Sequence, residues 1–342
     1  MSVTQTEYGV LPNGEKVTQL TICGEGGLSV SFITYGGTIT NLEFNGKDVV
    51  LGYTDLETYR IGGGSIGVTV GRYANRIAGG KFELNGIAYD VGCNEKGRNH
   101  LHGGTEGFQV KNWTVASVEE NAFTLQYVSP DGEMGYPGTM TVSVRIAVSA
   151  ENALLLEYTA VSDQDTVVNL TNHAYFNLNG YDGGDILDTL LQINAEAVTA
   201  INEQLIPTGE YLSVEGTPLD FRTAKPIGRD IRADYEQLNF GSGYDHNFIL
   251  GDTSERRLAV TAICEKSGIR MDSYTDQPGV QLYTANFLNS DFGKGGPMSQ
   301  YQGFCLETQH FPDSPHHAHF PTTVLKAGET FHSVTEYHFS KI

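Results

Sequence analysis

The feature that most constrains this chain is an alternation of apolar and polar residues over short runs. Five runs carry it: "LSVSFITYG" at 28–36, "FTLQYVS" at 123–129, "MTVSVRIAVS" at 140–149, "ALLLEYTAVS" at 153–162 and "GVQLYTANF" at 279–287. Alternation with a period of two is typical of antiparallel strands that bury one face. The pattern therefore predicts a chain built mainly from antiparallel strands.

Glycine-containing turns separate these runs. The chain has 41 glycines, and the tripeptides "PNG", "FNG", "LNG" and "PDG" indicate hairpin turns. Helical periodicity is confined to "TDLETYRIG" at 54–62 and "GRDIRADYEQL" at 228–238, so we expect few, short helices. Because no linker, charge block or repeat divides the chain, we predict one all-β domain over 1–342, a large antiparallel β-sandwich.

Composition restricts the partners. Asp and Glu outnumber Lys and Arg by 41 to 21, which gives a formal net charge of -20. Such a charge repels polyanions, so we expect neither nucleic acid nor anionic membrane as a partner.

The N-terminus resembles no signal peptide, and no apolar run approaches about 18 residues. Four widely spaced cysteines, Cys23, Cys93, Cys264 and Cys305, fit reduced thiols. We therefore predict a cytoplasmic protein.

Two glycine-flanked segments carry polar side chains suited to ligand binding. In "GRYANRIAGG" the Asn75 amide and the Arg76 guanidinium can recognise several hydroxyls at once; the alternative is a loop arginine held by backbone carbonyls. In "NHLHGG" His100 and His102 point to one side if the segment is extended. They can hold a metal, but no matching ligand set completes it. One histidine in a pocket, with Gly103–Gly104 allowing close approach of a ligand, is the favoured interpretation, and a structural histidine is the alternative.

A third segment, "TVVNLTNHAYFNLNG" at 166–180, is predicted to be a strand. Alternation places Thr171, His173, Tyr175 and Asn177 on one face. A face with hydroxyl, imidazole, phenol and amide groups is typical of a polar binding surface with an aromatic floor.

A fourth segment, "GYDHNFIL" at 243–250, places Asp245 and His246 just before an apolar strand. They are candidates for a binding site, and an Asx turn that leads into the strand is an equal alternative.

In a fifth segment, "GFCLETQHF" at 303–311, alternation puts Glu307 on the same face as Cys305 rather than among bulky apolar groups. A carboxylate there is either hydrogen-bonded or exposed in a cleft.

The histidines that follow, His316, His317 and His319, suggest a metal site at first sight. They lie in an irregular proline-containing segment without a nearby cysteine, so we expect no metal there. None of the segments singled out above carries a nucleotide-binding or serine-hydrolase motif.

Taken together and in this order, six motifs resemble the aldose 1-epimerase (galactose mutarotase) family: "GRYANRI", "NHLHGG", "NLTNHAYFNLNG", "DHNF", "PGVQLYTANF" and "CLETQHFPDSPHH". The likeness runs from about residue 25 to the C-terminus. It implies the galactose mutarotase-like supersandwich fold and an isomerase that interconverts the α and β anomers of aldohexoses such as galactose and glucose. It also implies a small-molecule sugar as substrate, no cofactor and no metal. We expect a monomer or homodimer.

The resemblance assigns roles residue by residue. The family's base falls on Glu307 and its acid on His173. The expected substrate-binding residues are Asn75, Arg76, His102, Asp245 and Gln281. His100 is one step too early to match the LHGG position. His310 stands where family members often have asparagine, which leaves the base untouched but can alter the pocket rim.

Mutarotation requires the anomeric hydroxyl to lose a proton while the ring oxygen gains one. Ordinary pKa values of about 4.3 for Glu and 6.5 for His suit Glu307 as base and His173 as acid, and we expect the two on opposite sides of the reacting centre. Two alternatives stay open: an enzyme for sugar phosphates that uses Arg72, Arg76 and Arg98, and a sugar-binding module without catalysis.

Overall fold

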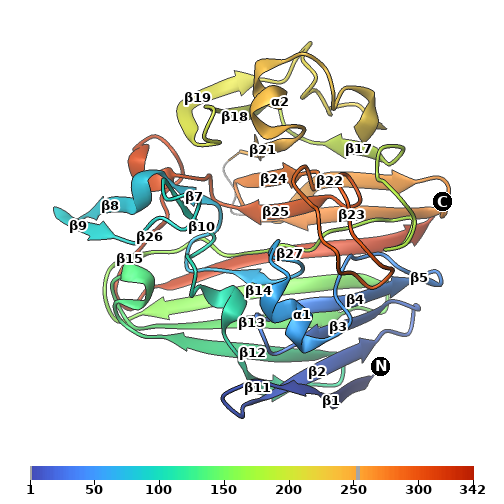
Figure 1. Cartoon of the computed structure of the whole chain (residues 1–342), viewed down its shortest axis with the longest axis horizontal. Coiled ribbons are helices and arrows are strands. Elements are labelled where there is room, and N and C mark those ends of the chain that lie inside the picture. Colours follow the sequence, from blue (N-terminus) through green and yellow to red (C-terminus); the bar gives the residue numbers. More distant parts are fainter. Residues whose placement is uncertain (1, 252–254) are drawn as a thin grey trace.

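A computed structural model describes residues 2–251 and 255–342, and strands dominate it (Figure 1). One sheet has nine strands in the order β11-β12-β13-β14-β27-β23-β22-β17-β20, and two sheets have five, in the orders β1-β2-β3-β4-β5 and β19-β18-β21-β24-β25. Every pair of neighbouring strands in them is antiparallel. The predicted all-β, antiparallel fold class is confirmed; the single domain stays a prediction.

The bounds of the elements are as follows. The nine-stranded sheet contains β11 (Thr114–Val118), β12 (Ala122–Ser129), β13 (Met140–Val148), β14 (Ala153–Ser162), β17 (Leu190–Ile193), β20 (Lys225–Pro226), β22 (Arg257–Cys264), β23 (Ile269–Thr275) and β27 (Thr330–Lys341). The first five-stranded sheet contains β1 (Ser2–Val10), β2 (Lys16–Cys23), β3 (Ser29–Ile33), β4 (Thr38–Phe44) and β5 (Lys47–Asp48). The second contains β18 (Ala197–Ile201), β19 (Pro207–Ser213), β21 (Asp245–Ile249), β24 (Gly279–Tyr283) and β25 (Cys305–Gln309).

Short strand pairs and helices complete the fold. The pairs are β6 (Thr69–Val70) with β16 (Thr171–Asn172), β7 (Arg76–Ile77) with β10 (His100–Leu101), β8 (Lys81–Leu84) with β9 (Ile87–Asp90), and β15 (Thr166–Val167) with β26 (Val324–Leu325). The helices are α1 (Leu56–Ile61) and α2 (Glu236–Gly241), and the 3-10 turns are η1 (Ala78–Gly80), η2 (Phe108–Val110), η3 (Glu133–Gly135), η4 (Ile227–Arg229) and η5 (Ser314–His316). In the part of the chain that the structure describes, no helix is long and apolar enough to span a membrane.

The core lies between the nine-stranded sheet and the two smaller sheets. On β14 the side chains of Leu154, Leu156 and Tyr158 are buried and those between them are partly exposed, as the alternation predicts. Across the interior the ring of Phe32 packs edge-on against Phe123 at 6.1 Å between centroids. One apolar cluster contains residues of all three sheets, so each small sheet buries its apolar face on the same core.

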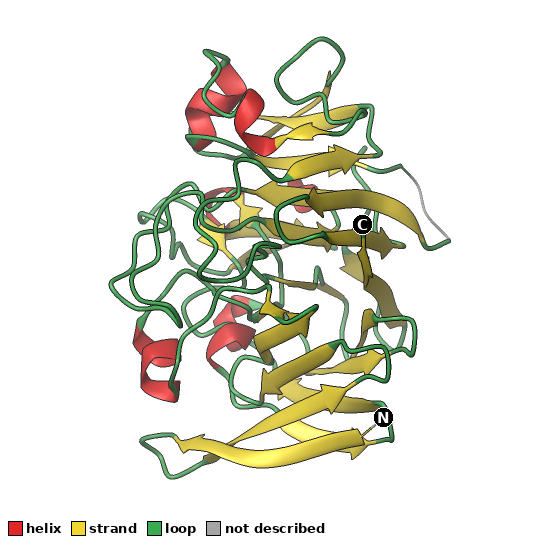
Figure 2. Cartoon of the chain, turned by 90° about the vertical axis from the view of Figure 1, so that its right-hand side faces the viewer, coloured by secondary structure: helices red, strands yellow, loops and turns green. Residues whose placement is uncertain are grey.

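The segment after β16 connects the two smaller sheets. Phe176 forms isolated bridges to Val50, just beyond β5, and to Phe304, just before β25. The backbone around His173 therefore runs between the two sheets, beside β25. Figure 2 shows the strands stacked along one side of the molecule and most of the long loops on the other.

The turn and helix predictions have mixed outcomes. Asn45–Gly46 and Asn85–Gly86 have positive φ at both residues and join paired strands, as expected for hairpins. Helix α1 confirms the helix predicted at 54–62, and Asp55 caps it through the Thr58 N–H. The helix predicted over 228–238 is wrong for most of its length, because only a 3-10 turn at Ile227–Arg229 and the start of α2 form there.

Candidate active site

Most of the polar motifs meet at one cavity of about 570 Å³. Six of the seven residues expected to form the site line it: Asn75, Arg76, His102, His173, Asp245 and Glu307. The seventh, Gln281, lies behind the wall and donates a 2.6 Å hydrogen bond from Nε2 to Oδ1 of Asp245. Segments that are more than 200 residues apart in the sequence thus contribute to a single pocket.

The register of strands β21, β24 and β25 explains how the second five-stranded sheet contributes residues to the cavity. Asn247 of β21, Gln281 of β24 and Glu307 of β25 are direct cross-strand partners. Two residues away from this row and on the same face of the sheet, Asp245 and Cys305 both pair with Tyr283. The alternation predicted for Glu307 and Cys305 is correct, and it turns the carboxylate toward the cavity instead of the core.

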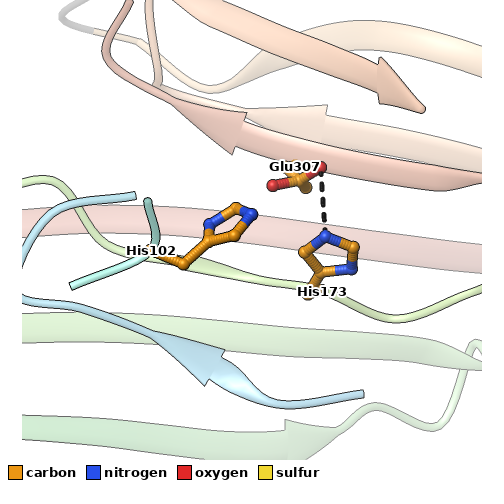
Figure 3. Close-up of side chains that lie close together, drawn as sticks. All are labelled: His102, His173 and Glu307. Atoms are coloured by element: carbon orange, nitrogen blue, oxygen red, sulfur yellow. Dashed lines mark ion pairs between the residues drawn. The ribbon is translucent and has the colours of Figure 1, made fainter. Parts of the chain in front are cut away.

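Glu307 and His173 form the centre of the site (Figure 3). The two side chains are 2% and 5% exposed, and Nε2 of His173 lies 3.6 Å from Oε1 of Glu307. The other carboxylate oxygen, Oε2, is buried and has no protein partner among the described residues. A buried oxygen without a partner is costly, and a ligand hydroxyl can donate to it.

Burial sets the protonation of this pair. It raises the pKa of Glu307 well above its usual range, and the nearby Asp245 carboxylate raises this pKa further while Arg76 opposes the rise. Burial also lowers the pKa of His173 to about 4. Burial thus disfavours both charged forms, the ionised carboxylate of Glu307 and the protonated ring of His173.

Arg76 is held in place by two carboxylates. Its Nε and Nη2 donate to Glu95 at 2.8 to 3.1 Å, and its Nη1 lies 3.8 Å from Oδ2 of Asp245. The planar guanidinium is thereby fixed at the cavity wall. The alternative of an arginine bound only to backbone carbonyls does not apply to Arg76. Arg72 comes closer to it: its Nη1 and Nη2 donate to the carbonyls of Ser129, Pro130 and Pro137, and its Nε donates to the Ser129 hydroxyl.

His102 is positioned by a backbone exchange with Asn75. The His102 N–H donates to the Asn75 carbonyl at 3.1 Å, and the Asn75 N–H donates to Nδ1 of His102 at 3.2 Å. Both residues have positive φ, 51° and 63°. His102 is therefore not in the extended conformation, and its ring turns away from His100. His100 is fully buried between Gly92 and Tyr136 and is a structural histidine.

Comparisons with known proteins agree with this geometry. The family model described as aldose 1-epimerase matches residues 18–338. The chain is 41% identical to galactose mutarotase of Bos taurus over 99% of both sequences, and 33% identical to aldose 1-epimerase of Escherichia coli over 96% of both. A crystal structure of galactose 1-epimerase from Lactobacillus acidophilus superposes with a TM-score of 0.89 at 28% identity, covering 99% of each chain.

The chain belongs to the aldose 1-epimerase family. The family that the six motifs predicted is confirmed, and so is the β-sandwich fold that this family implies. Family membership also makes a sugar substrate the expected ligand of the cavity.

Three site residues resemble a metal centre. His102, His173 and Glu307 each offer a ligand atom within 4.8 Å of the others, the only such group among the described residues (Figure 3). Metal-binding histidines usually donate their second ring N–H to an acceptor. Here Nδ1 of His102 instead accepts the Asn75 N–H, so the neutral ring carries its proton on Nε2, the atom a metal needs. The donor set suits hydroxyl groups better than a metal.

The strand predicted over 166–180 is only partly present. β16 ends at Asn172, and the two-residue alternation does not continue. His173 and Tyr175 do line the cavity, with their rings stacked 5.0 Å apart. Thr171 and Asn177 do not: the Asn177 amide donates to carbonyls of Gly184 and Gln302. Phe176 is buried in the core, whereas Tyr175 lines the cavity and its ring can face a sugar.

The histidines near the C-terminus serve the fold. His310 lies outside the cavity lining, contrary to the expectation of a changed rim, and its Nδ1 pairs with Oε1 of Gln277 at 2.9 Å. His316 contacts Asp313, while His317 and His319 contact the Pro207 and Gly209 carbonyls. Asp313 in turn accepts from the Ala78 N–H and donates its own N–H to the Arg76 carbonyl. This segment therefore supports β7, the short strand that carries Arg76.

Close packing, not ligand access, explains the Gly103–Gly104 turn. A Cβ on Gly103 would lie 1.8 Å from the Gly71 carbonyl oxygen. The prediction that these glycines let a ligand approach is therefore wrong. The turn needs glycine because its backbone packs closely against Gly71 beside His102.

Sequence reasoning missed several residues of the cavity. Glu95, Lys96, Arg98 and Glu203 line it from loops without a recognisable motif. So do Gly64 and Ser65, from "GGGSIG" at 62–67, whose letters fit both the glycine-rich nucleotide pattern and the serine-hydrolase pattern. This segment runs from α1 to β6, not from a strand into a helix, so neither motif's structural context is present.

Proposed function

We propose that this chain interconverts the α and β anomers of aldohexoses such as galactose and glucose, with Glu307 as base and His173 as acid. The observation that carries the proposal is the buried 3.6 Å approach of Nε2 of His173 to Oε1 of Glu307 inside a cavity lined by hydrogen-bonding groups. The names of the relatives, galactose mutarotase and aldose 1-epimerase, support the same reaction.

The proposed chemistry moves one proton in each direction. In the proposed reactive state of the sugar complex, Glu307 is ionised and His173 is protonated. Glu307 takes the proton of the C1 hydroxyl, His173 gives its proton to the ring oxygen, and the C1–O5 bond breaks to an open aldehyde. Rotation about C1–C2 exposes the other face, and the reverse transfers close the ring. Each positioned group is typically worth about 10²–10⁴ in rate.

Adjacency suits this reaction better than the opposed arrangement expected from the sequence. The two oxygens that exchange protons are both bonded to C1, so an acid and a base that are neighbours on one wall can each reach one of them. The pair carries a single proton before and after each transfer of the proposed reaction.

The other residues are proposed to hold the sugar. Arg76 and Asn75 donate to ring hydroxyls, Asp245 accepts from them, and Gln281 supports Asp245 through its 2.6 Å hydrogen bond. His102 is proposed to donate from Nε2 near the ring oxygen. No cofactor is required by this scheme.

Removal of the base tests the proposal. Glu307→Gln should lower the rate of α-D-galactose conversion, followed by polarimetry or two-dimensional exchange NMR, by at least about 10²-fold. Glu265→Gln, an exposed carboxylate in the turn between β22 and β23, is the matched control. A Glu307→Gln protein that folds, as judged by circular dichroism, and converts galactose at the wild-type rate contradicts the assignment.

The same assay separates the two alternatives. The cavity lining contains three cations, Arg76, Lys96 and Arg98, against four carboxylates, Glu95, Glu203, Asp245 and Glu307, so a phosphate group gains no net positive field there. We therefore expect galactose and glucose to react faster than hexose 6-phosphates. Sugar binding without faster anomer exchange would favour a binding module instead.

The cellular location and the oligomeric state of the protein are also proposals. All four cysteines are free, which supports a cytoplasmic location. A monomer or a homodimer is proposed for the assembly.

A further inference from the structure

The guanidinium of Arg76 binds Glu95 along one edge only. Its Nε donates to Oε1 and Oε2 of Glu95 at 3.1 and 3.0 Å, and its Nη2 donates to Oε1 at 2.8 Å. A guanidinium has five N–H donors, so the end formed by Nη1 and Nη2 keeps donors that Glu95 does not use. Among the described residues, no protein acceptor other than Glu95 is bonded to Nη2.

The Glu95 carboxylate keeps acceptor capacity on the cavity side. An ionised carboxylate has about four lone-pair positions, and within the described ranges the side chain of Glu95 accepts only from Nε and Nη2 of Arg76. The side chain of Glu95 is 18% exposed, compared with 9% for Arg76, and both residues line the cavity. A sugar hydroxyl in the cavity can therefore reach the carboxylate.

The loop that carries Glu95 is fixed by its own hydrogen bonds. The Glu95 N–H donates to the Asn99 carbonyl at 3.0 Å, and the Glu95 carbonyl accepts from the Asn99 N–H at 3.3 Å. Next to it, the Asn94 side chain exchanges two hydrogen bonds with the backbone of Leu101, the last residue of β10. Glu95 is thus held in place beside His102, and a preorganised group loses little entropy when a ligand binds.

We propose that Glu95 is a further sugar-binding residue, which accepts a hydrogen bond from one hydroxyl of a neighbouring pair while Arg76 donates to the other. The inference deepens the proposed function and rests on it. Nη2 of Arg76 and Oε1 of Glu95 are 2.8 Å apart, close to the spacing of neighbouring hydroxyl oxygens on a pyranose ring. A donor and an acceptor at this spacing match two adjacent hydroxyls.

The hydroxyl that Glu95 binds is not the anomeric one. Nη1 of Arg76 points away from the edge that holds Glu95, and it lies 3.8 Å from Oδ2 of Asp245. Glu95 and Asp245 therefore lie on opposite sides of the guanidinium. Asp245 is the neighbour of the proposed base, Glu307, on the same face of the sheet. The contact with Glu95 thus makes the site sensitive to a hydroxyl away from C1.

A counter-ion for Arg76 is the alternative role of Glu95. In that role Glu95 only keeps the guanidinium in place, and the hydroxyl that depends on it accepts a hydrogen bond from Arg76. Fluorine in place of an accepting hydroxyl preserves an acceptor. Fluorine in place of a hydroxyl that donates to a carboxylate removes the donor and brings two electronegative atoms together. Fluorinated sugars therefore separate the two roles.

The test measures kcat/KM for anomer exchange by two-dimensional exchange NMR with the full-length protein. The sugars are galactose and its deoxy and deoxyfluoro analogues at C2, C3, C4 and C6. Each sugar is compared between the wild type and Glu95→Gln, so that its intrinsic reactivity cancels in the ratio. Glu119→Gln is the matched control, because Glu119 binds Nε and Nη2 of Arg145 at 3.1 and 2.8 Å and does not line the cavity.

We expect Glu95→Gln to lower kcat/KM for galactose roughly 10- to 100-fold, the range typical of a hydrogen bond to a charged group, mainly through KM. For the deoxy analogue that lacks the contacted hydroxyl, the loss should shrink to less than about threefold. The fluoro analogue at the same position should react faster in Glu95→Gln than in the wild type. Positions that neither Glu95 nor Arg76 contacts should keep the full loss, and Glu119→Gln should alter none of these values.

Two results overturn the inference. One is a set of fluoro analogues of which none reacts faster in Glu95→Gln than in the wild type. The other is a crystal structure of the wild type with galactose in which no sugar oxygen lies within hydrogen-bond distance of the Glu95 carboxylate. This crystal structure decides even if Glu95→Gln fails to fold. A protein that binds galactose without exchanging its anomers refutes the proposed function, whereas the crystal structure still tests the contact with Glu95.

Discussion

At the scale of single residues, the site depends on charges that are buried close to one another. Asp245 is 7% exposed, accepts from Gln281 and approaches Arg76. Burial raises its pKa, and Arg76 and Gln281 oppose the rise. Because the Asp245 carboxylate also raises the pKa of Glu307, a residue proposed to bind sugar also tunes the proposed base.

Asp245→Asn separates these two effects. Loss of the charge should lower the pKa of Glu307, so that the base form survives to lower pH and the acid limb of the kcat profile moves down by up to about one pH unit. KM for galactose should rise, because an acceptor of sugar hydroxyls is weakened. Measurement of kcat and KM between pH 4 and 8 checks both. An acid limb that stays in place would show that Asp245 does not act on Glu307.

At the scale of elements, loops set the positions of half the site. β10 ends at Leu101, His102 follows at φ 51°, and Gly103 then passes against the Gly71 carbonyl. The C-terminal segment around Asp313 fastens the backbone at Arg76 and Ala78 from the other side. These contacts, which join distant segments, hold short strands that could not be stable alone.

Gly103→Ala tests the close approach at this turn. The new Cβ would meet the Gly71 oxygen at 1.8 Å, and φ is 78°, so the backbone must shift. Gly86→Ala is a matched control, since Gly86 also has φ 78° but no atom within 4 Å of its added Cβ. We expect Gly86→Ala to cost about 1–2 kcal/mol of unfolding free energy and Gly103→Ala roughly 3 kcal/mol or more. Urea unfolding measures both.

Only Gly103→Ala should also lower kcat/KM for galactose, because His102 immediately precedes Gly103. Equal losses of stability in the two variants would mean that the turn is free to relax.

At the scale of the whole molecule, a net charge of -20 is spread over a chain with a neutral proposed substrate. Many acidic side chains do have partners, such as Asp48 with Lys294 and Glu119 with Arg145. The excess nevertheless repels itself across the folded surface. The negative charge repels polyanions. Repulsion among the protein's own acidic groups lowers the stability of the folded state at low ionic strength.

Salt should therefore stabilise the protein. The Debye length falls from about 30 Å at 0.01 M to about 8 Å at 0.15 M ionic strength, which screens the repulsion. We expect the thermal midpoint to rise by roughly 2–4 °C over this range, equally in NaCl and KCl, while kcat/KM for galactose stays constant. Scanning calorimetry checks the first and polarimetry the second. A midpoint that falls with salt would mean that local ion pairs outweigh the net charge.

Patterns along the chain determined the strand content, the helix at 54–62, the face that Glu307 shares with Cys305, and, through six motifs, the family. These are local properties: alternation, turn chemistry and capping act between residues that are neighbours in sequence. The strand predicted at 166–180 failed because Phe176 bridges to both small sheets instead of continuing one strand beyond Asn172. The helix predicted at 228–238 is interrupted between a 3-10 turn and α2, a break that helical periodicity did not indicate.

Only the tertiary structure decided which polar groups meet. It brought Glu95 to Arg76, assigned His100, His310 and the later histidines to the fold, and set His173 between Glu307 and Cys305. It also reversed the ordinary pKa preferences of Glu307 and His173. Distances and burial between residues far apart in the chain produce these effects, and no pattern of neighbouring letters contains them.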